Sequence, residues 1–168
     1  MRIKPVFWVM GIILLLILLA GVIFFNMIFP SPISKAKMER LFKADQDLLV
    51  PIADYFIDLE YSSIYITNNH ESGFMHIRTE QVQIENPEIV RCLDTLFNER
   101  GYSVIGKKDS TIYFQRWSSL ERGRGIAYTV NSLAPKIEYV TDYSKLSKDN
   151  WYYYEEDFNE YKRRDQGN

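Results

Sequence analysis

The segment Trp151–Lys162, "WYYYEEDFNEYK", places six aromatic side chains among acidic ones near the end of the chain. Successive side chains of a strand point to opposite faces, so Trp151 and Tyr153 would share one face and the tyrosines beside them the other. The same letters also fit a helical stripe with spacings of three and four residues. We expect residues 151–155 to complete a sheet and Asp157 to begin a short helical turn.

Two roles are open for these aromatic rings. An exposed aromatic surface of this size would favour aggregation or mark an interaction site, whereas buried rings would close a hydrophobic core. We expect closure of the core.

The composition is that of a folded protein, because 46% of the 168 residues are hydrophobic and 25% are charged. This length allows one domain of ordinary size and a short additional segment. The net charge of −2, which becomes −4 without Arg2 and Lys4, argues against a nucleic-acid partner.

The additional segment is the apolar run Val6–Phe25, "VFWVMGIILLLILLAGVIFF", which contains no charged side chain. As a helix this run is roughly 30 Å long, which is the thickness of the hydrocarbon core of a bilayer. Pro5 and Pro30 flank it, as expected for the limits of a helix. The sequence therefore predicts a transmembrane helix over residues 6–29 that contacts membrane lipid, preceded by a basic tail over residues 1–5.

A cleaved signal peptide is the alternative, because Arg2 and Lys4 are basic and "SKA" at Ser34–Ala36 offers small residues for cleavage. The apolar run is longer than the roughly 7–15 residues of a signal peptide, which favours a retained signal anchor. The sequence has no N-glycosylation motif, and a bacterial envelope is the simplest setting.

The orientation of the anchor follows from two opposing features. Four basic residues after the apolar run would favour a cytoplasmic C-terminal domain: Lys35, Lys37, Arg40 and Lys43. The short charged N-terminal tail is a poor segment to translocate, which favours the opposite orientation. We expect a single-pass protein of the cell membrane with an extracytoplasmic C-terminal domain.

The next segment has a helical pattern of apolar residues up to Leu59. We expect residues 30–47 to form a juxtamembrane stalk and Pro51 to kink or divide the helix. The folded domain is predicted over residues 48–162, followed by a flexible tail over residues 163–168.

Within this domain, alternating residues at 62–67 and 74–79 flank a turn and predict a hairpin. A helix is predicted over Pro87–Arg100, because Asn86 can cap its beginning and Gly101 can end it. Three strands should follow this helix, over residues 102–108, 111–117 and 125–130. A further strand is predicted at "KIEYVT", residues 136–141. The fold class is α+β, with an antiparallel sheet and two helices on one of its faces.

Few residues suggest chemistry. His70, Glu71 and His76 lack the spacing of a zinc site, and Cys92 lies on the apolar stripe of its helix, where a buried thiol is expected. Neither a nucleophile motif nor a nucleotide-binding loop occurs. We therefore assign no catalytic, cofactor-binding or metal-binding residue, and no cofactor.

Five basic residues could form an edge that binds anionic headgroups or a carboxylate-bearing partner, or that only keeps the sheet soluble: Lys107, Lys108, Arg116, Arg122 and Arg124. Four acidic residues could instead pair with this edge within the molecule: Glu155, Glu156, Asp157 and Glu160.

The sequences "MRIK", the long apolar run, "LFKADQDLLVPIADYFIDLEY", "GIAYTV" and "WYYYEEDFNEYK" follow one another in this order. This layout resembles uncharacterised small bacterial single-pass membrane-anchored proteins. The resemblance covers most of the chain and implies a bacterial envelope location, and it carries no catalytic residue.

We expect a non-catalytic, membrane-anchored envelope protein whose exported domain contacts a membrane or envelope protein, or other envelope material. The alternative is a cell-envelope hydrolase that uses paired carboxylates, for example Asp109, Glu121 or Glu138. Such an enzyme needs a cleft with two carboxyl groups, one of which has a raised pKa.

Overall fold

A computed structural model of the chain describes five ranges of residues: 5–28, 32–69, 73–119, 121–130 and 133–165. The chain divides into two compact units, Met1–Ser31 and Pro32–Asn168.

The first unit contains one helix, α1, over Pro5–Ile28. Its described side chains, at residues 10–23, are all exposed. Within the part of the chain that the structure describes, no helix has both the length and the hydropathy of a membrane span. Residues 1–4 and Phe29, which we assigned to the basic tail and to the end of the span, lie outside the described residues.

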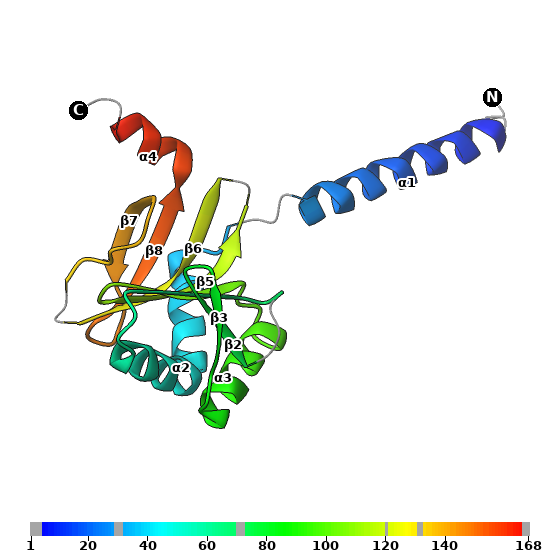
Figure 1. Cartoon of the computed structure of the whole chain (residues 1–168). Helices are drawn as coiled ribbons and strands as arrows, with labels where there is room; N and C mark the ends of the chain where they lie inside the picture. The colour runs from blue at the N-terminus through cyan, green and yellow to red at the C-terminus, as the bar shows by residue number, and fades with distance from the viewer. Residues whose placement is uncertain (1–4, 29–31, 70–72, 120, 131–132, 166–168) are drawn as a thin grey trace. The chain divides into compact units, whose positions relative to one another are not determined.

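Among its described residues, the second unit contains an antiparallel sheet of eight strands in the order β3-β2-β1-β4-β5-β6-β8-β7, together with three helices. This confirms the α+β class and the antiparallel sheet (Figure 1). The elements are α2 (Lys35–Asp58), β1 (Ser63–Thr67), β2 (Phe74–Ile77), β3 (Glu80–Gln83), α3 (Pro87–Asn98), β4 (Val104–Lys108), β5 (Thr111–Ser118), β6 (Arg122–Thr129), β7 (Val140–Lys145), β8 (Trp151–Asp157) and α4 (Phe158–Asp165).

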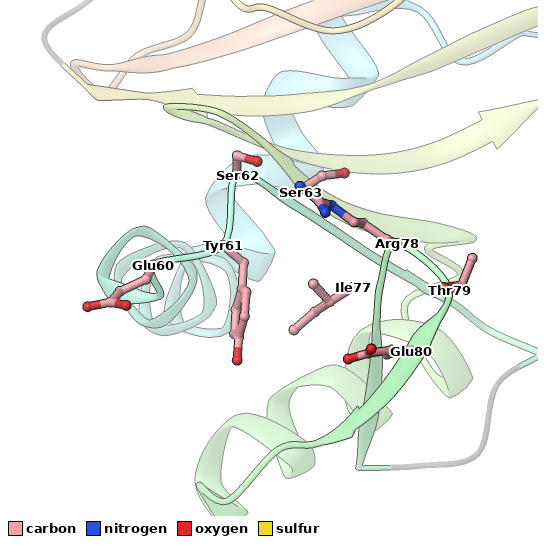
Figure 2. A pocket seen from close by; sticks show the side chains of 8 residues that line it. All are labelled: Glu60, Tyr61, Ser62, Ser63, Ile77, Arg78, Thr79 and Glu80. Atoms are coloured by element: carbon pink, nitrogen blue, oxygen red, sulfur yellow. The ribbon is translucent and has the colours of Figure 1, made fainter.

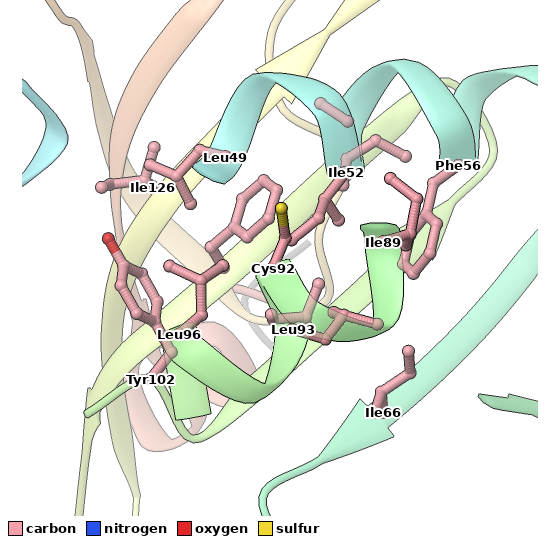
Figure 3. Close-up of a cluster of buried hydrophobic side chains, with 14 of the residues drawn as sticks. Leu49, Ile52, Phe56, Ile66, Ile89, Cys92, Leu93, Leu96, Tyr102 and Ile126 are labelled. Carbon is pink, nitrogen blue, oxygen red and sulfur yellow. The ribbon is translucent and has the colours of Figure 1, made fainter. Parts of the chain in front are cut away.

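The main hydrophobic core lies between the sheet and the pair α2 and α3, which contact each other. Figure 3 shows side chains of both helices directed toward Ile66 of β1 and Ile126 of β6. Trp151 packs in the same core, with its ring centroid 5.1 Å from that of Phe42 and 5.9 Å from that of Phe114. The two helices thus cover one face of the sheet.

Helix α3 begins as its sequence predicts, and it ends at Asn98, two residues before the predicted end at Arg100. The Asn86 side chain accepts a hydrogen bond from the Glu88 backbone N–H at 3.0 Å, and Pro87 takes the first helical position. Gly101 has a φ of +72°, a conformation that glycine adopts without steric cost.

Helix α2 is one element that continues through Pro51, so of the two predicted alternatives, a kink or a division, the division is wrong. The prediction of a stalk over residues 30–47 is also wrong, because Met38, Phe42 and Asp45 are buried in the domain. A proline inside a helix costs about 3 kcal/mol, but buried side chains such as Leu49 offset this cost by packing on the sheet.

The aromatic end of the chain is a strand followed by a helix, as predicted. Trp151, Tyr152, Tyr153 and Tyr154 are all buried, which confirms closure of the core. The carboxylate of Asp157 accepts a hydrogen bond from the Glu160 backbone N–H at 2.9 Å and caps α4.

Several other boundaries differ from the prediction, among them that of β6, which begins at Arg122 rather than at residue 125. Helix α4 extends to Asp165, so residues 163–165 are not part of a flexible tail, and residues 166–168 lie outside the described range. The strand predicted over residues 136–141 begins only at Val140. Strand β3, which pairs with β2, was not predicted.

Two buried charges connect the sheet to α2. The carboxylate of Asp45 accepts hydrogen bonds from the Tyr102 hydroxyl at 3.1 Å and from Arg116 at 3.0 Å. The Lys107 ammonium donates to the carbonyls of Phe56 at 2.8 Å and Leu59 at 2.6 Å, at the end of α2. Burial lowers the pKa of Lys107, and its charge is favourable beside the negative end of the helix.

The buried strand β8 should be indispensable for folding. We expect a chain that ends at Asn150 to lose its cooperative thermal unfolding transition, because β6 and β7 then lose the strand between them. A chain that ends at Asp157 keeps the sheet and is the control. Circular dichroism melting measures both, and an unchanged transition in the shorter chain would contradict the role of β8.

The Lys107 bridge can be tested with Lys107→Met. We expect a loss of about 2 kcal/mol in the free energy of unfolding, because carbonyl groups at the end of α2 lose their donor. Lys108→Met is the matched control, since the Lys108 side chain is 46% exposed and its ion pair with Glu138 should contribute less than about 1 kcal/mol. Urea denaturation of both variants gives the comparison, and equal losses would disprove a special role for Lys107.

A candidate binding groove on the open face of the sheet

The face of the sheet opposite α2 and α3 carries a second, smaller apolar cluster. Ala127, Tyr152 and Tyr154 are buried there, with Ile137 and Val140 packed against them. The segment before β7 therefore covers part of this face. We call it the open face, because α2 and α3 pack on the other side.

Glycines on the open face lie under large side chains of neighbouring strands. Gly106 of β4 pairs with Tyr113 of β5, and a Cβ atom at position 106 would collide with the tyrosine ring. Gly125 of β6 pairs with Tyr154 of β8, and a Cβ atom there would collide with the backbone of β5 and with that ring. The rings therefore lie flat across the sheet, and only glycine leaves them the space.

The third pair of this kind positions a carboxyl group. Gly123 of β6 lies opposite Glu156 of β8, and a Cβ atom at position 123 would collide with the Glu156 carboxylate. Glu156 Oε2 accepts a hydrogen bond from the Gln115 amide at 2.9 Å. The carboxylate thus lies across β6, between β8 and β5.

Two adjoining hollows, which together we call the Glu156 groove, share Gln115, Tyr139 and Glu156. The first, of about 380 Å³, is also lined by Ser63, Tyr65, Val104, Lys107, Lys108, Tyr113, Ile137 and Glu138. The second, of about 440 Å³, is also lined by Ser118, Ser119, Glu121, Arg122, Gly123 and Phe158. The groove combines tyrosine rings with a central carboxyl group.

The electrostatics of Glu156 are unusual for a glutamate. Burial raises its pKa to about 7, although the hydrogen bond from Gln115 lowers it. Among the described residues no cation lies within ion-pair distance of it. Burial, and next the charge of Glu156, raise the pKa of Tyr113 to about 12.

Tyr154 lies beside this group. Its hydroxyl is buried and has no hydrogen-bond partner within the described part of the chain. Burial and the nearby Glu156 and Tyr113 raise its pKa well above the ordinary range. Buried polar groups without partners are rare and often occur at functional positions.

The neighbouring charges are compensated within the molecule. Arg122 forms an ion pair with Asp157 at 2.9 Å, and Arg124 forms one with Glu155 at 3.0 Å. This agrees with the alternative in which the acidic residues pair with the basic edge within the molecule. Lys108 pairs with Glu138 at 3.3 Å. Arg116 and Lys107 have partners on α2 instead, which the sequence did not indicate. In this cluster Glu156 differs because its partner is a neutral amide.

The other candidate residues of the sequence are dispersed. Glu138 and Glu121 line the groove together with Glu156, one in each hollow. Asp109 lies in the turn between β4 and β5 with a φ of +52° and lines neither hollow. Cys92 is buried in the core, and burial raises its pKa.

The histidines are not brought together with further ligands. His76 lies in β2, whereas His70 and Glu71 lie outside the described residues. Within the described ranges, no group of three or more potential ligands could hold a metal ion.

A further hollow of about 440 Å³ lies between the end of α2 and the hairpin of β2 and β3. Glu60 and Tyr61 line it from one side and Ile77 and Glu80 from the other (Figure 2). Apart from Ile77, its lining residues are exposed. Its charged groups therefore remain solvated, and it is the weaker candidate site.

Glu156 was noticed in the sequence only as a member of an acidic cluster. The signal that distinguishes it is the register, which places a glycine opposite it and a glutamine within hydrogen-bond distance. Comparison of the chain with family models, curated proteins and solved structures gives no match.

The raised pKa of Glu156 predicts how stability depends on pH. The folded form holds the proton up to about pH 7, whereas the unfolded form loses it near pH 4.5, so stability falls as pH rises between these values. Glu156→Gln removes this loss. Relative to the wild type, the variant should therefore be more stable at pH 8 than at pH 4 by on the order of 3 kcal/mol. Urea denaturation at both pH values measures this, and a difference that does not change with pH would contradict the burial of the charge.

Proposed function

We propose that this protein is a single-pass membrane-anchored protein of the bacterial envelope, whose C-terminal domain makes non-catalytic contacts through the open face of its sheet. Three features support the proposal: the apolar segment over residues 6–29, the separate compact domain, and the Glu156 groove.

The anchor is supported by the apolar sequence of α1. The helix has 24 residues and is roughly 36 Å long, and residues 6–25 contain no charged side chain. The full span also includes residues whose side chains are not described, and for these the proposal rests on the sequence.

The observation that carries the binding role is the Glu156 carboxyl group in its groove. Burial disfavours the ionised form of Glu156, and this side chain belongs to neither apolar cluster of the domain. Groups that lower stability are common at functional sites, where binding offsets their cost. The absence of a nucleophile motif or nucleotide loop in the sequence favours binding over catalysis.

The anchor and its orientation can be tested in cells of a bacterial expression host. We expect the full chain in the membrane fraction after alkaline extraction and a chain without residues 6–29 in the soluble fraction. A C-terminal alkaline phosphatase, active only outside the cytoplasm, should be active, and a C-terminal green fluorescent protein should be dark. Release of the full chain by alkali would contradict the anchor, and the reverse reporter pattern would contradict export.

The contact surface can be tested by photo-crosslinking in intact cells. A photoreactive amino acid at Tyr65, which lines the groove and is 43% exposed, should give a discrete crosslinked product. The same group at Arg91, which is exposed on α3, is the matched control and should not give this product. The same product from both positions, or none from Tyr65, would argue against the open face as the contact surface.

A hydrolase remains the second candidate, because one observation favours it. The first hollow of the groove holds Glu156, whose pKa is raised to about 7, together with Glu138, which is ion-paired with Lys108. A protonated acid beside an ionised carboxylate is the arrangement that glycoside hydrolysis requires. Release of sugars from purified cell wall by the wild type, and its loss in both Glu156→Gln and Glu138→Gln, would support this candidate over the binding role.

A further inference from the structure

We propose that the Glu156 groove binds its ligand through an alkylammonium group, whose positive charge contacts the Glu156 carboxylate between the rings of Tyr113 and Tyr139. This inference rests on the proposed binding role of the open face and is independent of the membrane anchor. It names the chemical class of the ligand.

The first support is the charge balance of the groove. Its cations already have partners, since Lys108 pairs with Glu138, Arg122 pairs with Asp157, and Lys107 donates to carbonyls of α2. Glu156 has only the Gln115 amide within the described residues, and this bond uses Oε2. Oε1 is left for a donor from outside the molecule, and a cation is the donor that would also compensate the charge.

The second support is the lining of the groove. Tyr113 and Tyr139 line the first hollow together with Glu156. Tyr139 is 37% exposed, and the ring of Tyr113 lies flat over Gly106. The face of an aromatic ring attracts cations, so tyrosines beside a carboxylate are suited to an ammonium group.

Other ligand classes fit less well. A metal ion would need three or more protein ligands, and the described residues offer no such group. An anion would be repelled by Glu156 and would find the nearby cations engaged. The first hollow, of about 380 Å³, has room for a side chain or a small amine.

Several titratable or charged groups line the two hollows or lie beside Glu156: Tyr65, Lys107, Lys108, Tyr113, Glu121, Arg122, Glu138, Tyr139 and Tyr154. No histidine is among them. A change in affinity between pH 5.5 and pH 8 would therefore report on Glu156.

The test uses the full chain in a nonionic detergent and n-butylammonium chloride as the probe, followed by NMR chemical-shift titration. We expect binding roughly 30-fold tighter at pH 8 than at pH 5.5, because a carboxyl group with a pKa of about 7 is mostly protonated at the lower pH. Neutral n-butanol should not bind, and sodium chloride at equal ionic strength should produce no shift.

Two variants locate the site. Glu156→Gln should weaken butylammonium binding at pH 8 at least tenfold, whereas Glu60→Gln, in the hollow of Figure 2, should leave it unchanged. Circular dichroism melting shows that both variants are folded. Absence of binding, equal binding of butanol, or a loss only in Glu60→Gln would each overturn the proposal.

Two further probes distinguish the sources of the ammonium group. Cadaverine represents a free diamine, and a short lysine-containing peptide represents a protein partner. Tighter binding of either one than of butylammonium identifies the source, and failure of both to bind would overturn the proposal. If photo-crosslinking at Tyr65 succeeds while every amine fails, the contact role remains and only the assignment of the ligand is lost.

Discussion

The alternation of side chains along β8 is the constraint on which the rest of the domain depends. The strand lies between β6 and β7, so it has neighbours on both edges and buried side chains on both faces. Trp151 and Tyr153 pack in the core formed with the helices, whereas Tyr152 and Tyr154 pack on the open face. Because this register is fixed by so much buried surface, Glu156 must also lie on the open face, above Gly123.

The charged groups that are wholly or partly buried in this domain differ in the number of partners that surround them. Asp45 receives hydrogen bonds from a tyrosine and an arginine, and Lys107 donates to several carbonyls at the end of α2. Asp45 thus has a charged partner and Lys107 has several hydrogen-bond acceptors, and both connect the sheet to α2. Glu156 has a single neutral donor and a raised pKa, so it costs stability when it is ionised. A binding role explains such a group better than a role in stabilising the fold.

Much of the fold could be predicted from local sequence. Helix α3 was predictable because Asn86, Pro87 and Gly101 each act within a few residues along the chain. The hairpins followed from alternation and turn residues, and the strand and helix at the aromatic end followed from two periodicities that meet at Asp157.

Features that depend on tertiary contacts could not be predicted. Pro51 suggested a break in α2, but burial on the sheet keeps the helix continuous. Strand β3, "EQVQ", is polar and gains its structure from pairing with β2. The Glu156 groove depends on Gly123 lying opposite Glu156, and this register joins two residues more than thirty positions apart in sequence. The sequence therefore indicated only an acidic cluster, and the candidate site could be identified only once the pairing of the strands was known.

The central claim is that Glu156 is a partly buried carboxyl group with no cation within ion-pair distance among the described residues. The most direct measurement is an NMR titration of the side-chain carboxyl carbon of Glu156 in the ¹³C-labelled full chain, with the signal assigned by its absence in Glu156→Gln. The account predicts a midpoint near pH 7. A midpoint near pH 4.5, the ordinary value of a solvated glutamate, would contradict it.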